Sequence, residues 1–385
     1  MPPQPEAAPS PADRPLRLAF FGDPNSIHVR RWAGWFADRG HATVLLEPAG
    51  LEIVPGLPGL ITVERFTPYY HGRFRPRGYF AERRSLRDVL RRFRPDFVHG
   101  HYLTEYGWHA WMSGFHPYGI TVWGSDVTIS LRRSRRTAFY GRMALRGADL
   151  VTGDSASLIE DVIAAGARRG RTHLVQFGVD TKRFAPGPDP EALRARLGLG
   201  GRRVLFSPRL VQPLYRHGVA VEALATLPDD YVLLLGRYQV DEAELARLLA
   251  QAAALGVSER VVVVPGIGHS EMPDFYRLAA AVLTIPMSDA TPVTLLEALA
   301  CERPVVATDL PSVREWLGEL DPASLVAVDD ARATAEAIKR IAARGAAEQQ
   351  EIGRRGREIV QDRASQDANM SAVEALYRQV SSSRP

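Results

Sequence analysis

One segment of the chain carries two carboxylates near the start of an expected helix, and its residue types indicate a ligand-binding site. Residues 288–300 read Ser-Asp-Ala-Thr-Pro-Val-Thr-Leu-Leu-Glu-Ala-Leu-Ala, and they follow the apolar run 281–286, an expected strand. The backbone N–H groups at a helix start bind anions, and the helix dipole favours negative charge there. A diphosphate would therefore fit against this first turn. The residues of the turn are Pro292, Val293, Thr294 and Leu295.

The two acidic residues of this segment, Asp289 and Glu297, could bind hydroxyl groups of a ligand. Glu297 lies between the apolar residues Leu296 and Ala298, so we expect its helix to be buried. A buried carboxylate needs partners, and the hydroxyls of a sugar or ribose diol would supply them. The alternatives are an exposed helix position for Glu297 and a capping or turn position for Asp289. We favour ligand binding for both.

Short apolar runs alternate with helical patterns along most of the chain, in two groups. The first group comprises residues 16–21, 43–47, 60–63, 96–100, 120–123, 150–153 and 173–177, and the second comprises 203–207, 231–236, 261–266, 281–286, 304–308 and 325–328. Nearly continuous apolar runs are typical of parallel strands that are covered on both faces. Because helical patterns separate them, such as 29–39 and 241–255, the sequence predicts two doubly wound α/β domains.

A stretch rich in proline and glycine separates the two groups. Residues 181–201 are therefore expected to be a linker with a short helical piece, between an N-terminal domain at 16–180 and a C-terminal domain at 202–364. Ligands of such sheets bind at the carboxyl ends of the strands, so two sheets facing across a cleft could hold two substrates. The loop after Phe21 lacks the G-x-G-x-x-G pattern, which argues against a dehydrogenase.

Length and composition narrow the class of protein. The chain has 385 residues, of which 45% are apolar, enough for two buried cores. Residues 1–15 are expected to be a disordered tail without the features of a signal peptide. No apolar run approaches the ~20 residues that span a bilayer. The single cysteine, Cys301, can form neither an internal disulfide nor a cysteine zinc site, so we expect a buried thiol and a reducing, cytoplasmic compartment.

The formal net charge of +4 is unevenly distributed. Residues 65–94 carry ten arginines against Glu82 and Asp88. A second basic run comprises Arg132, Arg133, Arg135, Arg136, Arg142 and Arg146. These arginines are either a solvated surface or an attraction for an anionic partner, such as lipid headgroups at the inner face of a membrane or a phosphorylated acceptor. We expect no nucleic-acid partner, because no nucleic-acid-binding motif accompanies the charge.

From Leu16 to about Val380 the chain resembles the retaining glycosyltransferases of family 4, which have the GT-B fold. The residues from Asp289 to Pro292, followed by Glu297-Ala298, are similar to the family's E-G-x-P-x-x-x-x-E-A loop, with Asp for the first Glu and Ala for the Gly. Four other segments match in order, at 26–41, 173–186, 276–279 and 304–308. The resemblance implies an N-terminal acceptor domain, a C-terminal nucleotide-sugar donor domain, and a last helix at 365–385 that packs back on the first.

The family's G-R-L-x-x-x-K-G segment clamps the donor diphosphate with its Arg and Lys. Here Pro208-Arg209-Leu210 supplies the Arg, but the Lys is absent. Arg216 is the nearest cation, and it either replaces that Lys or is a surface charge. The resemblance implies that Arg209 and Asp289 act in catalysis, that Glu297 holds the nucleotide ribose, and that no metal or further cofactor is required.

The acceptor side departs from the family pattern. Its T-x-H-G-x-D segment reads Thr-Val-Trp-Gly-Ser-Asp at 121–126, so Trp123 stands in place of the His and cannot transfer a proton. Asp126 keeps the acidic position and is either a third catalytic residue or a turn residue. The acceptor-side candidates are Asn25, Ser26, His28, His101 and Trp123.

Two histidines at the end of an expected strand, His99 and His101, could suggest a metal site, and His109 follows on the next helix. Packing explains each of them more simply, and no carboxylate cluster supports a metal site, which we therefore reject.

The implied reaction moves a sugar from a nucleoside-diphosphate sugar to a sugar, lipid or small-molecule acceptor, with retention of anomeric configuration. One alternative is a nucleotide-sugar 2-epimerase of similar architecture, which would change the sugar without any acceptor. Another is a catalytically degenerate protein that only binds nucleotide or glycan, since Trp123, Asp289 and the missing Lys depart from the family pattern.

Overall fold

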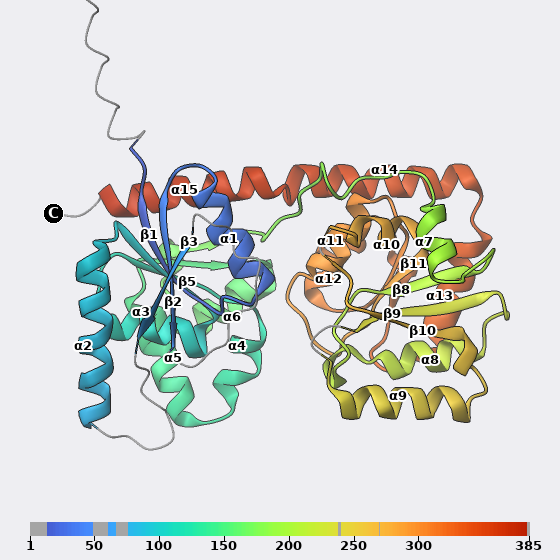
Figure 1. Cartoon of the computed structure of the whole chain (residues 1–385), viewed down its shortest axis with the longest axis horizontal. Helices are drawn as coiled ribbons and strands as arrows, with labels where there is room; N and C mark the ends of the chain where they lie inside the picture. Colours follow the sequence, from blue (N-terminus) through green and yellow to red (C-terminus); the bar gives the residue numbers. More distant parts are fainter. Residues whose placement is uncertain (1–13, 49–60, 67–75, 238–239, 269, 383–385) are drawn as a thin grey trace, which may run out of the picture. The chain divides into compact units, whose positions relative to one another are not determined.

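The computed structural model describes residues 14–48, 61–66, 76–237, 240–268 and 270–382 (Figure 1). The chain divides into two compact units, one formed by Met1–Phe177 with Met370–Pro385 and the other by Gly178–Asn369. Each unit contains a parallel sheet whose strands alternate with helices along the chain. The α/β class with two doubly wound sheets, predicted from the sequence, is therefore confirmed. Residues 1–13 of the expected tail lie outside the described residues.

Within the described residues, the first unit has seven parallel strands in the order β3-β2-β1-β4-β5-β6-β7. The strands are β1 (Arg17–Phe21), β2 (Ala42–Pro48), β3 (Ile61–Phe66), β4 (Phe97–His101), β5 (Tyr118–Thr121), β6 (Leu150–Gly153) and β7 (Thr172–Leu174). The helices are α1 (Ile27–Ala37), α2 (Pro76–Phe93), α3 (Trp108–Ser113), α4 (Ser125–Thr128), α5 (Arg135–Gly147), α6 (Ala156–Ala165) and α15 (Gln366–Ser382). A π-helical turn, Tyr102–Gly107, follows β4 directly, and 3₁₀ turns lie at Ser130–Arg132 and Arg169–Arg171.

The C-terminal helix α15 packs on the first sheet through Tyr377. This side chain is fully buried, and its ring stacks on Phe97 of β4 with ring centres 4.4 Å apart. Its hydroxyl accepts a hydrogen bond from Trp32 Nε1 at 3.1 Å and lies 2.7 Å from His99 Nδ1. A buried hydroxyl of this kind needs partners, and α1 and β4 supply them, so the end of the chain belongs to the first unit.

The second unit has, within the described residues, six parallel strands in the order β10-β9-β8-β11-β12-β13. The strands are β8 (Arg203–Ser207), β9 (Tyr231–Arg237), β10 (Val261–Pro265), β11 (Ala279–Thr284), β12 (Val305–Thr308) and β13 (Leu325–Val326). The helices are α7 (Glu191–Arg196), α8 (His217–Ala225), α9 (Glu242–Ala254), α10 (Met272–Leu278), α11 (Val293–Ala300), α12 (Pro311–Leu317), α13 (Ala331–Ala343) and α14 (Ala346–Arg363). Short 3₁₀ turns lie at Pro213–Tyr215, Ser258–Arg260 and Pro322–Ser324.

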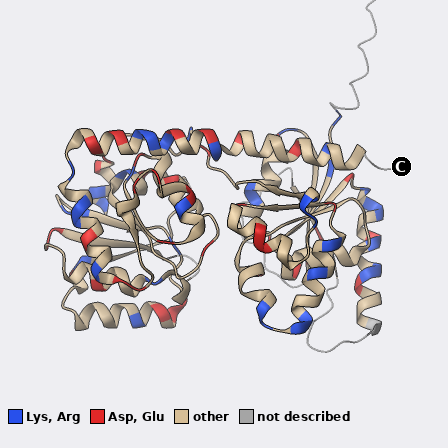
Figure 2. Ribbon diagram, turned by 180° about the vertical axis from the view of Figure 1, so that it is seen from behind, with Lys and Arg blue, Asp and Glu red and all other residues tan. Residues whose placement is uncertain are grey.

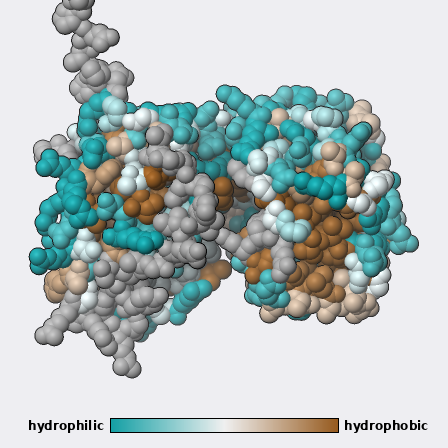
Figure 3. Space-filling view, in the orientation of Figure 1, coloured by the Kyte–Doolittle hydropathy of each residue, from teal (hydrophilic) through white to brown (hydrophobic). Residues whose placement is uncertain are grey.

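Side chains of the second sheet alternate between two cores. Phe206 of β8 packs with residues of α10, α11, α12 and α14, whereas Leu205 packs with residues of α8, α9 and α13. This arrangement explains the continuous apolar runs of the sequence, because both faces of each central strand are buried. The edge strand β10 is less covered, since its valines at 261–263 are only half-buried. Figure 3 shows a hydrophobic area, in brown, on the viewed face of this unit.

Most predicted strands differ from the observed strands by one to three residues at an end, and two of these differences concern the first unit's candidate residues. The expected strand 120–123 is β5 at Tyr118–Thr121, because these four residues pair with β4. Trp123 therefore lies in the loop after the strand, where its side chain can take part in a site. The expected strand 173–177 ends at Leu174, which leaves Phe177 in irregular backbone.

Candidate functional site

The loops after β8 and β11 bring three polar side chains of the second unit together. The Arg209 guanidinium donates to Asp289 Oδ2 at 2.6 Å and to Thr294 Oγ1 at 3.2 Å. Its central carbon lies 4.3 Å from the ring centre of Tyr215. The two loops meet because β8 and β11 are parallel neighbours, so their carboxyl ends share one edge of the sheet. The guanidinium is thus fixed at the start of α11.

Asp289 is held at both its side chain and its backbone. The Arg209 and Asp289 side chains are only 12% and 18% exposed, which removes much of the screening by water. Burial raises the pKa of Asp289, and the Arg209 guanidinium opposes that rise. Ser312 of α12 donates from its hydroxyl to the Asp289 carbonyl at 3.0 Å. These bonds fix the orientation of Asp289 before any ligand binds.

The amides available at the start of α11 differ from those expected. The Pro292 carbonyl accepts the amides of Leu295 at 2.9 Å and Leu296 at 3.3 Å. The first two amides of α11 belong to Val293 and Thr294, and the helix itself provides no carbonyl partner for them. An anion at this helix start would therefore contact the amides of Val293 and Thr294, whereas the amide of Leu295, which was also expected to contact it, is bonded to the Pro292 carbonyl.

Glu297 is buried, so its interpretation as an exposed helix residue is wrong. The residue is 6% exposed and accepts a hydrogen bond from the Tyr276 hydroxyl of α10 at 2.7 Å. Thr294 and Glu297 are three positions apart and lie on the same face of α11. Thr294 contacts Arg209, so the face of α11 that carries Glu297 also carries a residue of the Arg209 cluster.

Arg216 occupies an exposed ion pair at the start of α8. Its Nη2 donates to Asp329 Oδ2 at 2.6 Å, and the two side chains are 37% and 46% exposed. Pairs this exposed contribute little to stability. The next residue, His217, is buried, and burial lowers its pKa, so the neutral ring donates from Nε2 to the Leu210 carbonyl at 2.9 Å. This bond fixes the backbone next to Arg209.

Aromatic rings and two histidines gather where strands of the first sheet end. His28 at the start of α1 lies 5.4 Å from Trp123 and 4.9 Å from Phe177 between ring centres. His101 ends β4, is 1% exposed, and lies 5.0 Å from the Trp32 ring. Burial lowers the pKa of His101 to about 3, so its ring is neutral. Among the residues that the structure describes, neither ring nitrogen of His101 has a hydrogen-bond partner.

The other two acceptor-side candidates form the turn between β1 and α1. The Asn25 amide donates to Asp23 Oδ1 at 2.8 Å, and Asn25 Oδ1 accepts from Arg30 Nη2 at 3.4 Å. The Ser26 amide donates to the Asp23 carbonyl at 3.0 Å, and its hydroxyl makes no capping bond to α1. The turn places both polar side chains at the carboxyl end of β1.

Asp126, expected as a third catalytic residue, is enclosed in the first unit. It is 0% exposed, and its carboxylate accepts the amides of Leu103 at 2.7 Å, Trp123 at 3.0 Å and Val127 at 3.1 Å. Burial raises its pKa to about 6 against the lowering effect of these amides. Asp126 therefore positions the loop that carries Trp123, which matches its alternative interpretation as a turn residue.

His99 and His109 have packing roles, as the sequence favoured. His99 is fully buried, with Nε2 2.7 Å from Thr121 Oγ1, and its pKa lies well below the usual range because of burial. His109 Nδ1 lies 2.5 Å from Glu82 Oε1, and both side chains are buried. Each ring is thus enclosed within the first unit.

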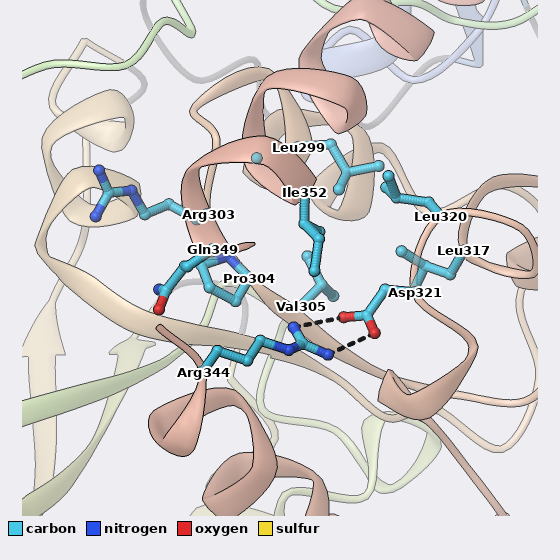
Figure 4. A pocket seen from close by; sticks show the side chains of 11 residues that line it. Leu299, Arg303, Pro304, Val305, Leu317, Leu320, Asp321, Arg344, Gln349 and Ile352 are labelled. Carbon is cyan, nitrogen blue, oxygen red and sulfur yellow. Dashed lines mark hydrogen bonds and ion pairs between the residues drawn. The ribbon is translucent and has the colours of Figure 1, made fainter. Parts of the chain in front are cut away.

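A small cavity in the second unit belongs to its core. Leu299, Val305 and Ile352 line it, and the Asp321–Arg344 ion pair lies beside it, with an N–O distance of 2.6 Å (Figure 4). Its volume of about 10 Å³ holds no organic ligand. Cys301 lies in the same core, and burial raises the pKa of its thiol to about 12, so the thiol is unreactive.

The described residues contain neither a candidate metal site nor a candidate membrane span. No group of three or more His, Cys, Asp or Glu side chains in the described ranges is arranged to hold a metal ion. In the same part of the chain, no helix combines the length and the hydropathy that crossing a membrane requires.

Two family profiles match the chain. The profile of the 4-like glycosyl transferases matches residues 17–155, and that of the group 1 glycosyl transferases matches residues 190–359.

Curated relatives match over shorter stretches. A D-inositol 3-phosphate glycosyltransferase of Xylanimonas cellulosilytica is 32% identical over 254 residues, which cover 62% of this chain and 58% of the relative. One from Mycobacterium sp. (strain JLS) is 39% identical over 140 residues, 36% of this chain and 31% of the relative. The chain thus spans less than two thirds of the length of these relatives.

Solved structures match over nearly the whole chain. The HepE protein of Anabaena, in complex with UDP and glucose, has a TM-score of 0.79 at 17% identity and covers 94% of this chain and 98% of its own. A glycosyltransferase of Rickettsia africae has a TM-score of 0.81 at 15% identity, with 96% and 100% covered. At these identities the likeness is one of fold, and it agrees with the expected GT-B class.

Proposed function

Because this chain belongs to the group 1 glycosyltransferases, we propose that it transfers a sugar from a nucleoside-diphosphate sugar to an acceptor hydroxyl. The observation that carries this proposal is Arg209, held between Asp289 and Thr294 at the start of the helix that carries the buried Glu297. A cation, two helix amides and two carboxylates on one sheet edge suit a ligand with a diphosphate and several hydroxyls.

The reaction breaks the bond between the sugar C1 and the diphosphate oxygen, which leaves with the electron pair. Negative charge then grows on the diphosphate, and positive charge spreads over the sugar ring as in glycoside hydrolysis. The Arg209 guanidinium and the amides of Val293 and Thr294 stabilise the leaving group without having to reorient. Because these groups supply positive charge, we propose that no metal ion is required.

The carboxylates have separate tasks in this proposal. Glu297, oriented by the Tyr276 hydroxyl, accepts the two hydroxyls of the nucleotide ribose. Asp289, oriented by Arg209 and Ser312, accepts hydroxyls of the donor sugar. The acceptor oxygen forms the new bond to C1, and we propose retention of configuration, with the acceptor proton passing to the departing diphosphate oxygen on the same face of the sugar.

The acceptor is proposed to bind at the carboxyl edge of the first sheet. Trp123 and Phe177 offer aromatic faces there, and the ring of His28 contacts both. Aromatic faces pack against the C–H groups of sugars and other amphipathic rings, so a sugar, a glycolipid head or a polyol is the class of acceptor that we favour. The related inositol-phosphate glycosyltransferases make a phosphorylated polyol a reasonable first acceptor to test.

A further part of the proposal is contact with an anionic membrane surface, in a protein of the cytoplasm. Helix α5 exposes Phe139 to 58% and Met143 to 37%, one turn apart. Arginines flank these two side chains on the same helix, and Figure 2 shows basic positions, in blue, at α5 and the turn before it. Apolar side chains with arginines around them suit the interface of anionic lipids.

Vesicle sedimentation tests the membrane contact. Phosphatidylglycerol vesicles should carry down the wild type at low salt, and phosphatidylcholine vesicles should not. A variant with Phe139→Ser and Met143→Ser should stay in solution with both. Equal binding of wild type and variant would contradict a role for α5.

A product assay tests the transfer itself. Purified protein is incubated with one nucleotide sugar, with and without acceptor, and the products are followed by proton NMR. A new glycoside with the anomeric configuration of the donor supports transfer with retention. A changed sugar without acceptor would identify an epimerase, and tight nucleotide binding with no product from any acceptor would identify a binding protein.

A further inference from the structure

A second cavity of the second unit is lined by basic side chains. It measures about 420 Å³ and lies where β8 and β11 begin. Five arginines line it, and Asp189 is the acidic residue among its lining. The arginines are Arg194, Arg202, Arg203, Arg277 and Arg303. Cavities of several hundred Å³ accommodate small organic ligands.

This cavity is separate from the site around Arg209. Arg203 and Ala279 are the first residues of β8 and β11, whereas Arg209 and Asp289 follow the last residues of the same strands. A strand of five or six residues is roughly 17–20 Å long. The two strands are parallel, so the cavity and the Arg209 cluster lie at opposite edges of the sheet, and the cavity lining includes no residue of that cluster.

The ion pairs of the lining residues leave an excess of positive charge. Asp189 pairs with Arg194 at 2.6 Å, and it is half exposed. Arg203 and Arg277 pair with Asp230 and Asp274, which are not among the lining residues and are 48% exposed each. Exposed pairs of this kind hold their partners weakly.

The remaining two arginines of the lining have no carboxylate partner among the described residues. The Arg202 guanidinium donates to the carbonyls of Leu199 at 3.3 Å and Gly198 at 3.0 Å. Arg303 donates from Nε to the Cys301 carbonyl at 3.3 Å. Burial lowers the pKa of Arg303, and the charges of Glu302 and Asp189 oppose that lowering only in part. Figure 4 shows its guanidinium pointing away from the small apolar cavity beside it.

We propose that this cavity is a second anion site, which binds the phosphate group of a small phosphorylated molecule. Guanidinium groups bind phosphate oxygens through paired N–H donors, and five arginines in the lining of one cavity favour a group with more than one negative charge. The anion would give Arg303 the partner that the protein does not provide. This site stands independently of the proposed sugar transfer, because it shares no residue with the donor site.

Calorimetric titration with inorganic pyrophosphate, and then with glucose 6-phosphate, tests the site at low ionic strength. The Arg209→Ala variant is the starting protein, so that anion binding at the donor site is weakened. The Arg209→Ala variant should still bind one equivalent of pyrophosphate. Adding Arg303→Gln should weaken that binding at least tenfold, and adding Arg303→Lys should restore part of it. Arg354→Gln, which removes the same charge from an exposed position on α14, should change little.

Three results would overturn the proposal. One is equal affinity of the Arg303→Gln and Arg354→Gln variants, and another is the loss of all anion binding in Arg209→Ala alone. If Arg303→Gln does not fold, Arg203→Gln replaces it in the titration, because the Arg203 side chain is half exposed. Unchanged pyrophosphate affinity in Arg203→Gln is the third result. The phosphate group could belong to a soluble molecule or to a lipid headgroup, and vesicles that contain phosphatidic acid distinguish the two. The proposal of a soluble ligand requires that these vesicles do not compete with pyrophosphate for the cavity.

Discussion

Replacing Tyr276 by Phe should lower the stability of the second unit and raise the KM for the nucleotide-sugar donor. The change removes one hydroxyl, which donates to Glu297 Oε2 at 2.7 Å, and leaves the ring in place. Tyr276 is 0% and Glu297 6% exposed, so water cannot replace the lost bond. A hydrogen bond to a charged group contributes about 1.5–3 kcal/mol to stability. For a domain of this size, that corresponds to a fall in Tm of roughly 3–12 °C.

The effect on the donor should be smaller than the effect on stability. The hydroxyl bonds Glu297 with or without donor, so only the loss of orientation weakens binding. Because 1.4 kcal/mol is tenfold in affinity, we expect the donor KM to rise about threefold to tenfold. The assay is initial-rate kinetics with varied donor, beside thermal unfolding of the same protein.

Tyr118→Phe is the matched control for this prediction. Tyr118 is also buried, but its hydroxyl donates to the neutral Ala144 carbonyl in the first unit. This variant should lose about 0.5–1.5 kcal/mol of stability and keep the wild-type donor KM. An unchanged donor KM in Tyr276→Phe, together with a lowered Tm, would refute the placing of Glu297 in the donor site.

Three further perturbations give distinct outcomes. Arg209→Gln should lower kcat/KM about a hundredfold, the usual effect of removing one group that stabilises developing charge, and Arg216→Gln should lower it less; the reverse order would assign the clamp to Arg216. His101 has a pKa lowered to about 3 in the fold, so folding stability falls as pH drops below 6.5, by about 1.4 kcal/mol between pH 7.5 and 5.5. His101→Leu should remove that part of the pH dependence in urea unfolding, and an unchanged dependence would show that the pKa of His101 is the same in the folded and unfolded states. Activity should survive EDTA, and loss that Mg²⁺ restores would contradict the metal-free proposal.

The architecture could be read from the sequence because it depends on local patterns. The apolar runs at β8, β9 and β11 match observed strands within two residues at most, since strands buried on both faces tolerate few polar side chains. The burial of Glu297 also followed from its apolar neighbours. These are properties of consecutive residues, which the sequence shows directly.

Contacts between distant residues could not be predicted in the same way. Arg209 and Asp289 are eighty residues apart, and nothing in their neighbourhoods indicates the 2.6 Å ion pair. Tyr276 was part of a matched segment, but its bond to Glu297 depends on how α10 and α11 pack. The enclosure of Asp126 likewise depends on the amide of Leu103, which comes from a turn after a different strand.

The basic cavity had no sequence signal at all. Its arginines come from α7, the loop before β8, the first position of β8, the end of α10 and the turn after α11. In an arginine-rich chain each of them resembles an ordinary surface residue. Only the sheet, which brings the starts of β8 and β11 together, makes them neighbours.

A thermal-shift panel of UDP, GDP, dTDP and ADP, on the wild type and on Glu297→Ala, tests the donor site most directly. A nucleotide at about a hundred times its Kd should stabilise the wild type by roughly 2.7 kcal/mol. We predict that one nucleotide raises the Tm of the wild type. Glu297→Ala should have a lower unliganded Tm, because the Tyr276 hydroxyl loses its bond to Glu297, and it should lose most of the shift measured from that lower value. A flat panel for the wild type, or an equal shift in the variant, would contradict a donor site built on Glu297.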